Sequence, residues 1–534
     1  MLKMRRILRN RPLAQPAGIS RRNFLRMTGI GAAGVLSGAA LIPLASAAST
    51  GQKKTGFAPD VEIALSARPA EVGILPGRPT RSWVYRGRVV RGTGSSLVPV
   101  PNSYLGPTIH VKTGQKVRIR FNNHIPDESI VHWHGLHVPA EMDGHPRYVI
   151  PQGKSYMYEF EVRNRAGTYW YHPHPHGRTG PQVYGGLAGL FLVSDDEEAA
   201  AGLPSGAFDI PLVIQDRSFD ADNQLVYLNG QMMGGMMGRM GGFLGDRILV
   251  NGQPRFTLPV ATRPYRLRLL NGSNSRIYKV AWQDGRPLVI IGTDGGLLEK
   301  PVERSYVMLA PAERLELWAD FSRDSVDSQV GLVSLPFDAG MMGGGMMGRG
   351  RMMGGGNALP NGAGFTICRM HIQRRERSKF SLPARLSTIS RYRPQAAVNA
   401  GRTRSFSLLM RHMAWTINGR TFQMEAVAAD ERVRLGTMEL WEFTNPGGGM
   451  GMMGGMGMPH PMHLHGKQFQ VLSRSGVRHA GYVDEGWKDT VLVMPGERVR
   501  LLVRFDDYPG LFLYHCHNLE HEDLGMMRNY YVQS

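Results

Sequence analysis

Cysteine is nearly absent from this chain: its 534 residues include only two, which excludes a fold held by disulfides and a Cys-rich zinc module. Acidic residues are also scarce, because 43 Asp and Glu stand against 63 Lys and Arg and the formal net charge is +20. Beyond the first 47 residues, no apolar run is long enough to cross a membrane. The apolar fraction of 42% is nevertheless ordinary and excludes a chain that is disordered throughout.

The first 47 residues have the features of an export signal. They contain eight Lys and Arg and no acid, with Arg21-Arg22 shortly before Phe24-Leu25. A Gly- and Ala-rich apolar stretch follows from Met27 to Leu44, and Ala45-Ser46-Ala47 matches a small-residue cleavage site. This order resembles the twin-arginine signal, which is read by a receptor. We therefore predict a signal peptide at 1–47, transport by the twin-arginine export machinery and a periplasmic protein without a stable membrane span; an uncleaved anchor is the alternative.

The remaining chain is less basic than the whole. It keeps 55 Lys and Arg against 43 acids, a net charge of +12. Many arginines, such as Arg266 and Arg268, lie on alternate positions of strand-like runs, which is the usual place for a solvated face. No basic motif with interleaved aromatic residues is present, so we expect no nucleic-acid partner.

From Val61 onward, the pattern is one of short strands. Apolar and polar residues alternate in runs such as 117–121 and 498–503, and these runs are bounded by Gly, Pro, Asn and Asp. Such alternation predicts an all-β protein of half-buried strands in sandwiches. Cys368 lies in one of these runs and is expected to be a buried apolar residue.

Two shifts in composition divide this part of the chain. One is an acidic, Ala-rich stretch between 195 and 206, and the other is a basic, Pro-containing run over 373–404. They predict three domains, at 60–196, 207–373 and 404–534.

Methionine is in excess, with 31 residues. Sixteen of them lie in three Gly-rich segments, Met232–Gly242, Met341–Gly356 and Gly447–Met458. Gly-rich segments bury little, so we expect all three to be surface loops or poorly ordered. Thioether sulfur is soft and prefers Cu(I) to hard cations.

Four clusters of histidine stand out, two towards each end of the chain after residue 60. They contain ten of the eighteen histidines, and the last also holds a cysteine and a methionine. The clusters are His132-Trp133-His134, His172-Pro173-His174, His460-Pro461-Met462-His463-Leu464-His465, and His515-Cys516-His517 with His521 and Met526. Because alternate side chains of a strand share a face, each His-x-His pair places two imidazoles on one side, and four converging pairs could hold a multinuclear metal site.

The last cluster predicts a second kind of site. Cys516 points away from the imidazoles on either side of it. Together with His460, His521 and Met526 it forms a set of two His, one Cys and one weak Met ligand, which is typical of a blue-copper electron-transfer centre. Structural zinc is four-coordinate and seldom needs a thioether, so zinc is disfavoured.

These clusters, in this order, resemble those of the multicopper oxidase family and, within it, of the bacterial copper-efflux oxidases. The likeness covers essentially the whole chain after the signal and includes stretches without ligands, at 105–109, 209–217 and 266–272. It implies three cupredoxin-like Greek-key β-sandwich domains, with the metal cluster shared by the first and third, and with Met/Gly-rich surface insertions. We expect a monomer.

The resemblance also implies four copper ions and their ligands. The type 1 copper is expected on His460, Cys516 and His521, with Met526 axial. The type 2 copper is expected on His132 and His463, and the two type 3 coppers on His134, His172 and His517 and on His174, His465 and His515.

The activity implied is the one-electron oxidation of a reductant coupled to the four-electron reduction of dioxygen to water. Electrons would pass through Cys516 to the histidines beside it. Asp143 and Glu522 match acidic positions that the family is thought to use as proton relays. Solvated surface acids are the alternative for both.

The third Met-rich segment runs directly into His460. By the resemblance, an Asp and a Met before this histidine bind substrate copper; here Met458 stands at the Met position and Met456 replaces the Asp. We therefore predict that Met456 and Met458 capture Cu(I), with loose binding by flexible loops as the alternative.

The sequence favours a periplasmic cuprous oxidase that confers copper tolerance. A laccase-like oxidase of phenols or other metals is the first alternative. A copper-sequestering protein without turnover is the second. A metal-free cell-division or structural protein of the same fold is the third, and the complete ligand set argues against it.

Overall fold

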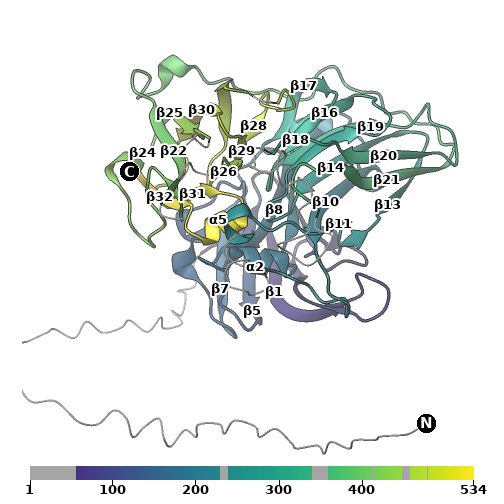
Figure 1. Cartoon of the computed structure of the whole chain (residues 1–534), viewed down its shortest axis with the longest axis horizontal. Helices are drawn as coiled ribbons and strands as arrows, with labels where there is room; N and C mark the ends of the chain where they lie inside the picture. The colour runs from purple at the N-terminus through teal and green to yellow at the C-terminus, as the bar shows by residue number, and fades with distance from the viewer. Residues whose placement is uncertain (1–55, 229–237, 340–358, 412–413, 448–456, 478) are drawn as a thin grey trace, which may run out of the picture. The chain divides into compact units, whose positions relative to one another are not determined.

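The structure, a computed structural model, describes residues 56–228, 238–339, 359–411, 414–447, 457–477 and 479–534. Its strands form six sheets and its helices are all short (Figure 1), so the predicted all-β class is confirmed. The predicted signal and Met456 lie outside the described residues. No described helix is long and apolar enough to span a membrane.

The first nine strands form two sheets with the orders β2-β1-β5-β7 and β3-β4-β9-β8-β6. In each sheet one neighbouring pair is parallel, β1 with β5 and β4 with β9. The strands are β1 (Val61–Val72), β2 (Thr80–Arg91), β3 (Leu97–Val98), β4 (Thr108–Lys112), β5 (Lys116–Asn123), β6 (Val131–His134), β7 (Ser155–Glu161), β8 (Gly167–Pro173) and β9 (Gly189–Ser194).

The next twelve strands repeat this arrangement in sheets β12-β11-β10-β14-β19-β16-β17 and β13-β21-β20-β15-β18. The parallel pairs are β10 with β14 and β13 with β21. The strands are β10 (Asp209–Arg217), β11 (Arg247–Val250), β12 (Gln253–Pro254), β13 (Thr257–Ala261), β14 (Pro264–Asn271), β15 (Tyr278–Trp282), β16 (Leu288–Thr293), β17 (Gly296–Arg304), β18 (Val307–Leu309), β19 (Arg314–Asp320), β20 (Gln329–Ser334) and β21 (Phe365–Arg374).

The last strands form sheets β23-β22-β25-β30-β27-β28 and β24-β32-β31-β26-β29, again with one parallel pair each, β22 with β25 and β24 with β32. This threefold repeat of one topology is what a Greek-key sandwich repeated along the chain requires. The strands are β22 (Arg404–Arg411), β23 (Ala414–Ile417), β24 (Arg432–Arg434), β25 (Thr437–Thr444), β26 (His460–Leu464), β27 (Phe469–Ser475), β28 (Trp487–Lys488), β29 (Thr490–Val493), β30 (Arg498–Phe505), β31 (Gly510–Cys516) and β32 (Met527–Gln533).

Short helices connect these strands. Two of them, α2 and α5, pack against each other and against the strands β8 and β31 (Figure 1). The α-helices are α2 (Thr179–Tyr184), α3 (Asp196–Ala200) and α5 (Leu519–Asp523), and the 3₁₀ turns are η1 (Gly94–Ser96), η2 (Ala140–Met142), η3 (Pro146–Tyr148), η4 (Gly206–Phe208), η5 (Pro394–Ala396) and η6 (Ala429–Glu431).

Three large clusters of buried apolar side chains follow the same division of the chain, centred on residues such as Ile119, Leu317 and Val503. The period of two explains how they form: in β5 the side chains of Val117, Ile119 and Phe121 are buried while Lys116 is exposed. Cys368 is buried, as predicted, and burial raises the pKa of its thiol to about 12. The predicted domain limits stay predictions.

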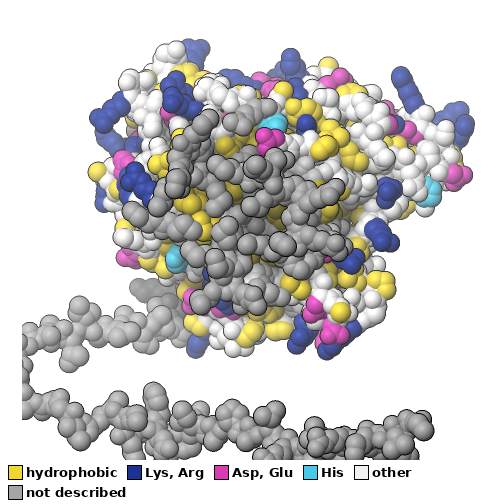
Figure 2. Space-filling view, viewed as in Figure 1, with side chains coloured by type: hydrophobic (Ala, Val, Ile, Leu, Met, Phe, Trp, Pro, Cys, Tyr) yellow, Lys and Arg dark blue, Asp and Glu magenta, His cyan; other side chains and the backbone are white. Residues whose placement is uncertain are grey.

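The alternating arginines of β14 are not on a solvated face. Arg266 and Arg268 are only 2% and 3% exposed, so that expectation is wrong for them. The physical reason is charge pairing: Glu316 accepts from both guanidinium groups, and Arg268 also bonds Asp209 at 2.6 Å. In Figure 2, Lys and Arg are scattered among other residue types over the described part of the visible face.

Burial alone would raise the pKa of Glu316, but Arg266 and Arg268 lower it from 4.5 to about 2. Its ionisation therefore stabilises the fold above pH 4.5, and this stabilisation is lost as the pH falls towards 2. We expect E316Q to lower the unfolding free energy by about 3 kcal/mol at pH 7, because two buried guanidinium groups lose a charge partner. Denaturant unfolding at several pH values should show the wild-type advantage shrinking below pH 4.5.

E299Q is the matched control, since Glu299 pairs with Arg391 with both side chains more than two-fifths exposed. It should change the free energy by no more than about 1 kcal/mol. A loss of equal size in both variants, or one independent of pH, would contradict the buried-pair explanation.

Candidate metal centre

Strand pairing brings the histidine clusters together. In the antiparallel pair β6–β8, His132 lies opposite His172, and in β26–β31, His463 lies opposite His515. All ten predicted ligand histidines are buried, at 1% exposure or less, together with Cys516 and Met526. Two strands of the first group, β6 and β8, and two of the last, β26 and β31, therefore present their imidazoles to one shared, buried space.

The predicted type 1 residues form one of these groups. Ligand atoms of His460, Cys516 and His521 lie within 4.8 Å of one another. The Cys516 sulfur is 3.4 Å from His460 Nδ1 and 3.7 Å from His521 Nδ1. The Met526 carbonyl accepts from the Cys516 amide at 3.0 Å, which holds the backbones of these two residues together. Burial raises the pKa of the Cys516 thiol, so its thiolate needs a cation beside it.

On the other side of Cys516 the remaining histidines converge as predicted from strand alternation. His132 Nε2 and His463 Nε2 are 3.4 Å apart. His515 Nε2 is 3.3 Å from His174 Nε2 and 3.0 Å from His465 Nε2. A third set consists of His134, His172 and His517, and their ligand atoms also lie within 4.8 Å of one another.

These distances fit metal ligation. Imidazoles bound to one ion at about 2.0–2.1 Å in roughly tetrahedral geometry have nitrogens about 3.4 Å apart. Among the described residues, His172 Nε2 and both ring nitrogens of His517 are buried without a hydrogen-bond partner. Burial lowers the pKa of His132, His134 and His463 well below 6.5, so these rings are neutral and have a free lone pair at neutral pH.

The two predicted acids are buried beside this cluster, not on the surface. Asp143 Oδ2 accepts from His465 Nδ1 at 2.8 Å, and its backbone carbonyl accepts from His132 Nδ1 at 2.6 Å. Both contacts turn the Nε2 atoms of these rings towards the shared space. Glu522 lies 3.1 Å from His515 Nδ1. Burial would raise the pKa of Glu522, but the neighbouring His174 and His515 lower it to about 2, whereas burial raises the pKa of Asp143.

Comparison with known proteins identifies this arrangement. Two family models described as multicopper oxidase match residues 84–198 and 397–534. A multicopper oxidase of Staphylococcus aureus is 31% identical over 437 residues, which cover 82% of this chain and 84% of the relative. The chain belongs to the multicopper oxidase family. It is therefore an oxidoreductase that uses dioxygen as electron acceptor and copper as cofactor.

Solved structures show the same likeness. The crystal structure of McoA, a multicopper oxidase of Aquifex aeolicus, has a TM-score of 0.75 and 35% identity, and the match covers 90% of this chain and 97% of that one. CueO of the lignin-degrading bacterium Ochrobactrum, described as a laccase-like multicopper oxidase, has a TM-score of 0.72 and 29% identity over 88% and 97% of the two chains.

Sequence reasoning missed a buried ion pair that supports this multicopper oxidase site. Asp489 Oδ1 is 3.1 Å from His134 Nε2, and the Asp489 carbonyl accepts from His463 Nδ1 at 2.8 Å. Arg314, on β19, donates to both oxygens of this carboxylate and to the Thr168 carbonyl on β8. One guanidinium thus joins strands of all three groups. No local motif marks Arg314, because only tertiary packing brings it to the histidines.

A second missed feature covers the residues predicted to bind the type 1 copper. His521 Nε2 and Trp415 Nε1 both donate to the Met240 carbonyl at 2.9 Å. The Trp415 ring lies 4.8 Å from the rings of both His460 and His521. Met240 stands in a helical turn, 238–241, at the end of the first Met-rich segment.

The expectation that the Met-rich segments are surface loops is wrong at the two places that the structure describes. Met240 is 2% and Met458 3% exposed, and Met458 packs in the core of the last strands. Both residues are held by hydrogen bonds to their carbonyls, Met458 by Asn445 Nδ2 at 2.7 Å. The second segment, Met341–Gly356, and residues 232–237 and 448–456 of the other two lie outside the described residues, so the prediction is untested there.

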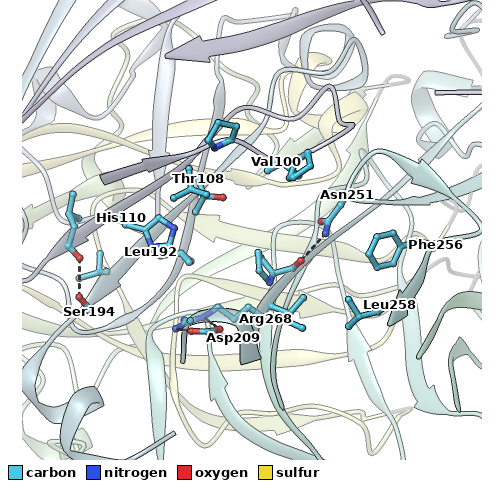
Figure 3. A pocket seen from close by; sticks show the side chains of 18 of the residues that line it. Val100, Thr108, His110, Leu192, Ser194, Asp209, Asn251, Phe256, Leu258 and Arg268 are labelled. Atoms are coloured by element: carbon cyan, nitrogen blue, oxygen red, sulfur yellow. Dashed lines mark hydrogen bonds and ion pairs between the residues drawn. The ribbon is translucent and has the colours of Figure 1, made fainter. Parts of the chain in front are cut away.

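A cavity of about 700 Å³, lined in part by His110, lies outside the cluster of predicted ligands. Val100, Leu192, Phe256 and Leu258 line its apolar part, and Arg268 and Asp209 lie at its charged end (Figure 3). None of the predicted copper ligands lines it.

We expect D489N to lower the copper content of the purified protein, because His134 and His463 lose the group that orients them and Arg314 loses its charge partner. Removing such a support costs about 10- to 100-fold in metal affinity. Metal analysis should show fewer copper ions per chain, while the blue absorption of the Cys516 site persists.

D284N is the control, since Asp284 forms a surface pair with Arg286. It should leave the copper content unchanged. If D489N also keeps its full copper content, Asp489 does not support the cluster.

Proposed function

We propose that this multicopper oxidase is a periplasmic cuprous oxidase, which oxidises Cu(I) to Cu(II), reduces dioxygen to water and so protects the cell from copper. Its resident cofactor would be four copper ions: one type 1, one type 2 and two type 3. The ligands would be those predicted, since His460, Cys516 and His521 gather at one place and the other eight histidines at another.

The cover over His521 is the observation that carries this proposal. The ring nitrogen that points away from Cys516 is sealed by the Met240 carbonyl and flanked by Trp415, so a bulky organic reductant has no direct contact with this ring. A single metal ion needs much less room. The chain on both sides of the site carries thioethers, at Met240 and Met458, which suit Cu(I).

The protein's own residues position ligands and hold protons. Bound copper would supply the one-electron transfers and the reduction of dioxygen. Asp143 keeps His132 and His465 in the tautomer that frees Nε2. Buried Asp143 contacts His465 and buried Glu522 contacts His515, two histidines of one predicted type 3 set, and both acids are positioned to relay the protons that water formation consumes.

Laccase-like oxidation of phenols is the second candidate. It is supported by the likeness to Ochrobactrum CueO, which is described as active towards lignin model compounds. Comparing oxygen uptake with Cu(I) and with a phenol distinguishes the two candidates. Copper binding without any oxygen uptake would instead indicate a sequestering protein.

M458L tests the thioether with little change in core volume. We expect kcat/KM for Cu(I) to fall about tenfold, because a soft ligand next to the type 1 residues is lost. Deleting 449–457, the segment that includes Met456, should lower it further. Oxygen uptake with Cu(I) measures both effects, and the blue absorption confirms that the Cys516 site is intact.

M494L is the matched control, because Met494 is equally buried but packs with Ile277 and Leu492 in another cluster. Unchanged Cu(I) kinetics in both M458L and the deletion would refute capture by this segment.

Replacing Arg21 and Arg22 together by Lys tests the location. A twin-arginine signal is read by a receptor, so we expect the protein to stay in the cytoplasm with residues 1–47 uncleaved. Cell fractionation and the mass of the protein measure this. Normal export of the double variant would contradict the twin-arginine prediction.

A further inference from the structure

A second pocket, of about 640 Å³, opens on the surface between β1, β2, α2 and the segment that follows β10. Its walls are rich in flat apolar side chains: Trp83, Tyr184 and Tyr227, with Pro126 and Pro181. This volume lies within the range of about 300–1,000 Å³ that is usual for small-molecule sites. The pocket is distinct from the buried histidine cluster, and no predicted copper ligand lines it.

One wall residue connects this pocket with the type 1 residues. The Tyr227 hydroxyl donates to Glu520 Oε1 at 2.7 Å. Glu520 is 1% exposed and is covalently followed by His521. A single hydrogen bond therefore separates a partly exposed phenol ring from the residue next to a type 1 histidine.

Glu520 is held firmly in this position. Besides Tyr227, its carboxylate accepts from Asn274 Nδ2 at 2.8 Å, from the Phe243 amide at 2.9 Å and from the Ser275 hydroxyl. Four donors from segments that connect strands of the middle group thus fix a carboxylate of α5. None of these bonds belongs to a copper ligand.

The contact between Tyr227 and α2 is also close. A side chain on Gly180 would place its Cβ 2.5 Å from the Tyr227 hydroxyl, so only glycine fits there. The Tyr227 ring stacks on Tyr184, with centroids 4.7 Å apart and planes at 29°, and lies 5.1 Å from Phe243. The phenol ring of Tyr227 is therefore held between the pocket and Glu520.

We propose that this pocket, which we call the aromatic pocket, binds planar phenols and passes their electrons to the type 1 site through Tyr227 and Glu520. The inference rests on the proposed oxidase function for its electron acceptor. Since Met240 and Trp415 cover His521, a phenol needs another point of entry, and the aromatic pocket supplies one. Flat rings suit the walls formed by Trp83 and the prolines.

The chemistry balances without an added reactant. Each bound phenol loses one electron, which travels along Tyr227, its hydrogen bond and the Glu520–His521 peptide link. The phenol O–H bond breaks, its proton passes to water at the open mouth of the pocket, and a phenoxyl radical leaves. Four phenols and one dioxygen thus yield four phenoxyl radicals and two waters.

Binding is tested with 2,6-dimethoxyphenol on the reduced, oxygen-free holoenzyme, where the phenol binds without turnover. We expect W83A to raise Kd, measured by titration calorimetry, about tenfold, and W83F to restore most of the affinity because it keeps a flat ring. L258A, in the separate 700 Å³ cavity of Figure 3, is the matched control and should bind like wild type. Wild-type affinity in W83A would overturn the proposal.

Electron transfer is tested with Y227F, which keeps the ring but removes the hydrogen bond to Glu520. We expect Kd and KM for the phenol to stay near wild type and kcat to fall about tenfold or more. The same variants are assayed with Cu(I). A change in copper loading alters both activities alike, so the ratio of phenol turnover to Cu(I) turnover measures only the pathway through Tyr227 and Glu520. An unchanged ratio in both Y227F and W83A would refute the pathway.

The outcomes separate the two proposals. If wild type oxidises phenol but not Cu(I), the cuprous-oxidase function fails, and the Trp83 and Tyr227 variants still test the aromatic pocket. If it oxidises Cu(I) and neither binds nor oxidises the phenol, the aromatic pocket proposal fails alone. Thermal unfolding of each variant identifies any loss that is due to misfolding.

Discussion

The structure is organised around buried histidines whose ring nitrogens point their lone pairs at one another. At 3.4 Å and 3.0 Å, the ring nitrogens of His132 and His463, and of His465 and His515, face each other among buried side chains. Neutral imidazoles gain from this arrangement only when a cation lies between them. Surrounding polar groups support this arrangement. Asp143 accepts hydrogen bonds from Nδ1 of His132 and of His465, which leaves the Nε2 atom of each ring free to face the cluster.

The positions of residues that depend only on their near neighbours in the chain were predictable from the sequence. The period of two in a strand is enough to put His515 and His517 on one face and Cys516 on the other, and it also predicted the all-β class. The grouping of Cys516 with His460 was predicted from the types of ligand that a blue-copper centre uses. The rest depends on partners far away in the chain. Asp489 and Arg314 are 175 residues apart and are ordinary charged residues until β19 packs beside the cluster.

The errors have the same origin. Arg266 and Arg268 follow the pattern of an exposed face, yet Glu316 neutralises them inside the protein, and alternation cannot distinguish these cases. Met240 and Met458 lie at the ends of flexible-looking sequence, but hydrogen bonds to their carbonyls hold both in place. Every residue has a backbone carbonyl, so the amino-acid composition of a segment does not show which carbonyls accept hydrogen bonds from distant residues.

The ligands also constrain when the site is able to form. Of the eight histidines outside the Cys516 group, four come from residues 132–174 and the other four from the last 75 residues of the chain. A nascent or truncated chain therefore has no complete cluster, however well its first strands have folded. Metal capture thus depends on synthesis of nearly the whole chain: only a chain that extends past His521 has the full set of histidine lone pairs that would hold copper.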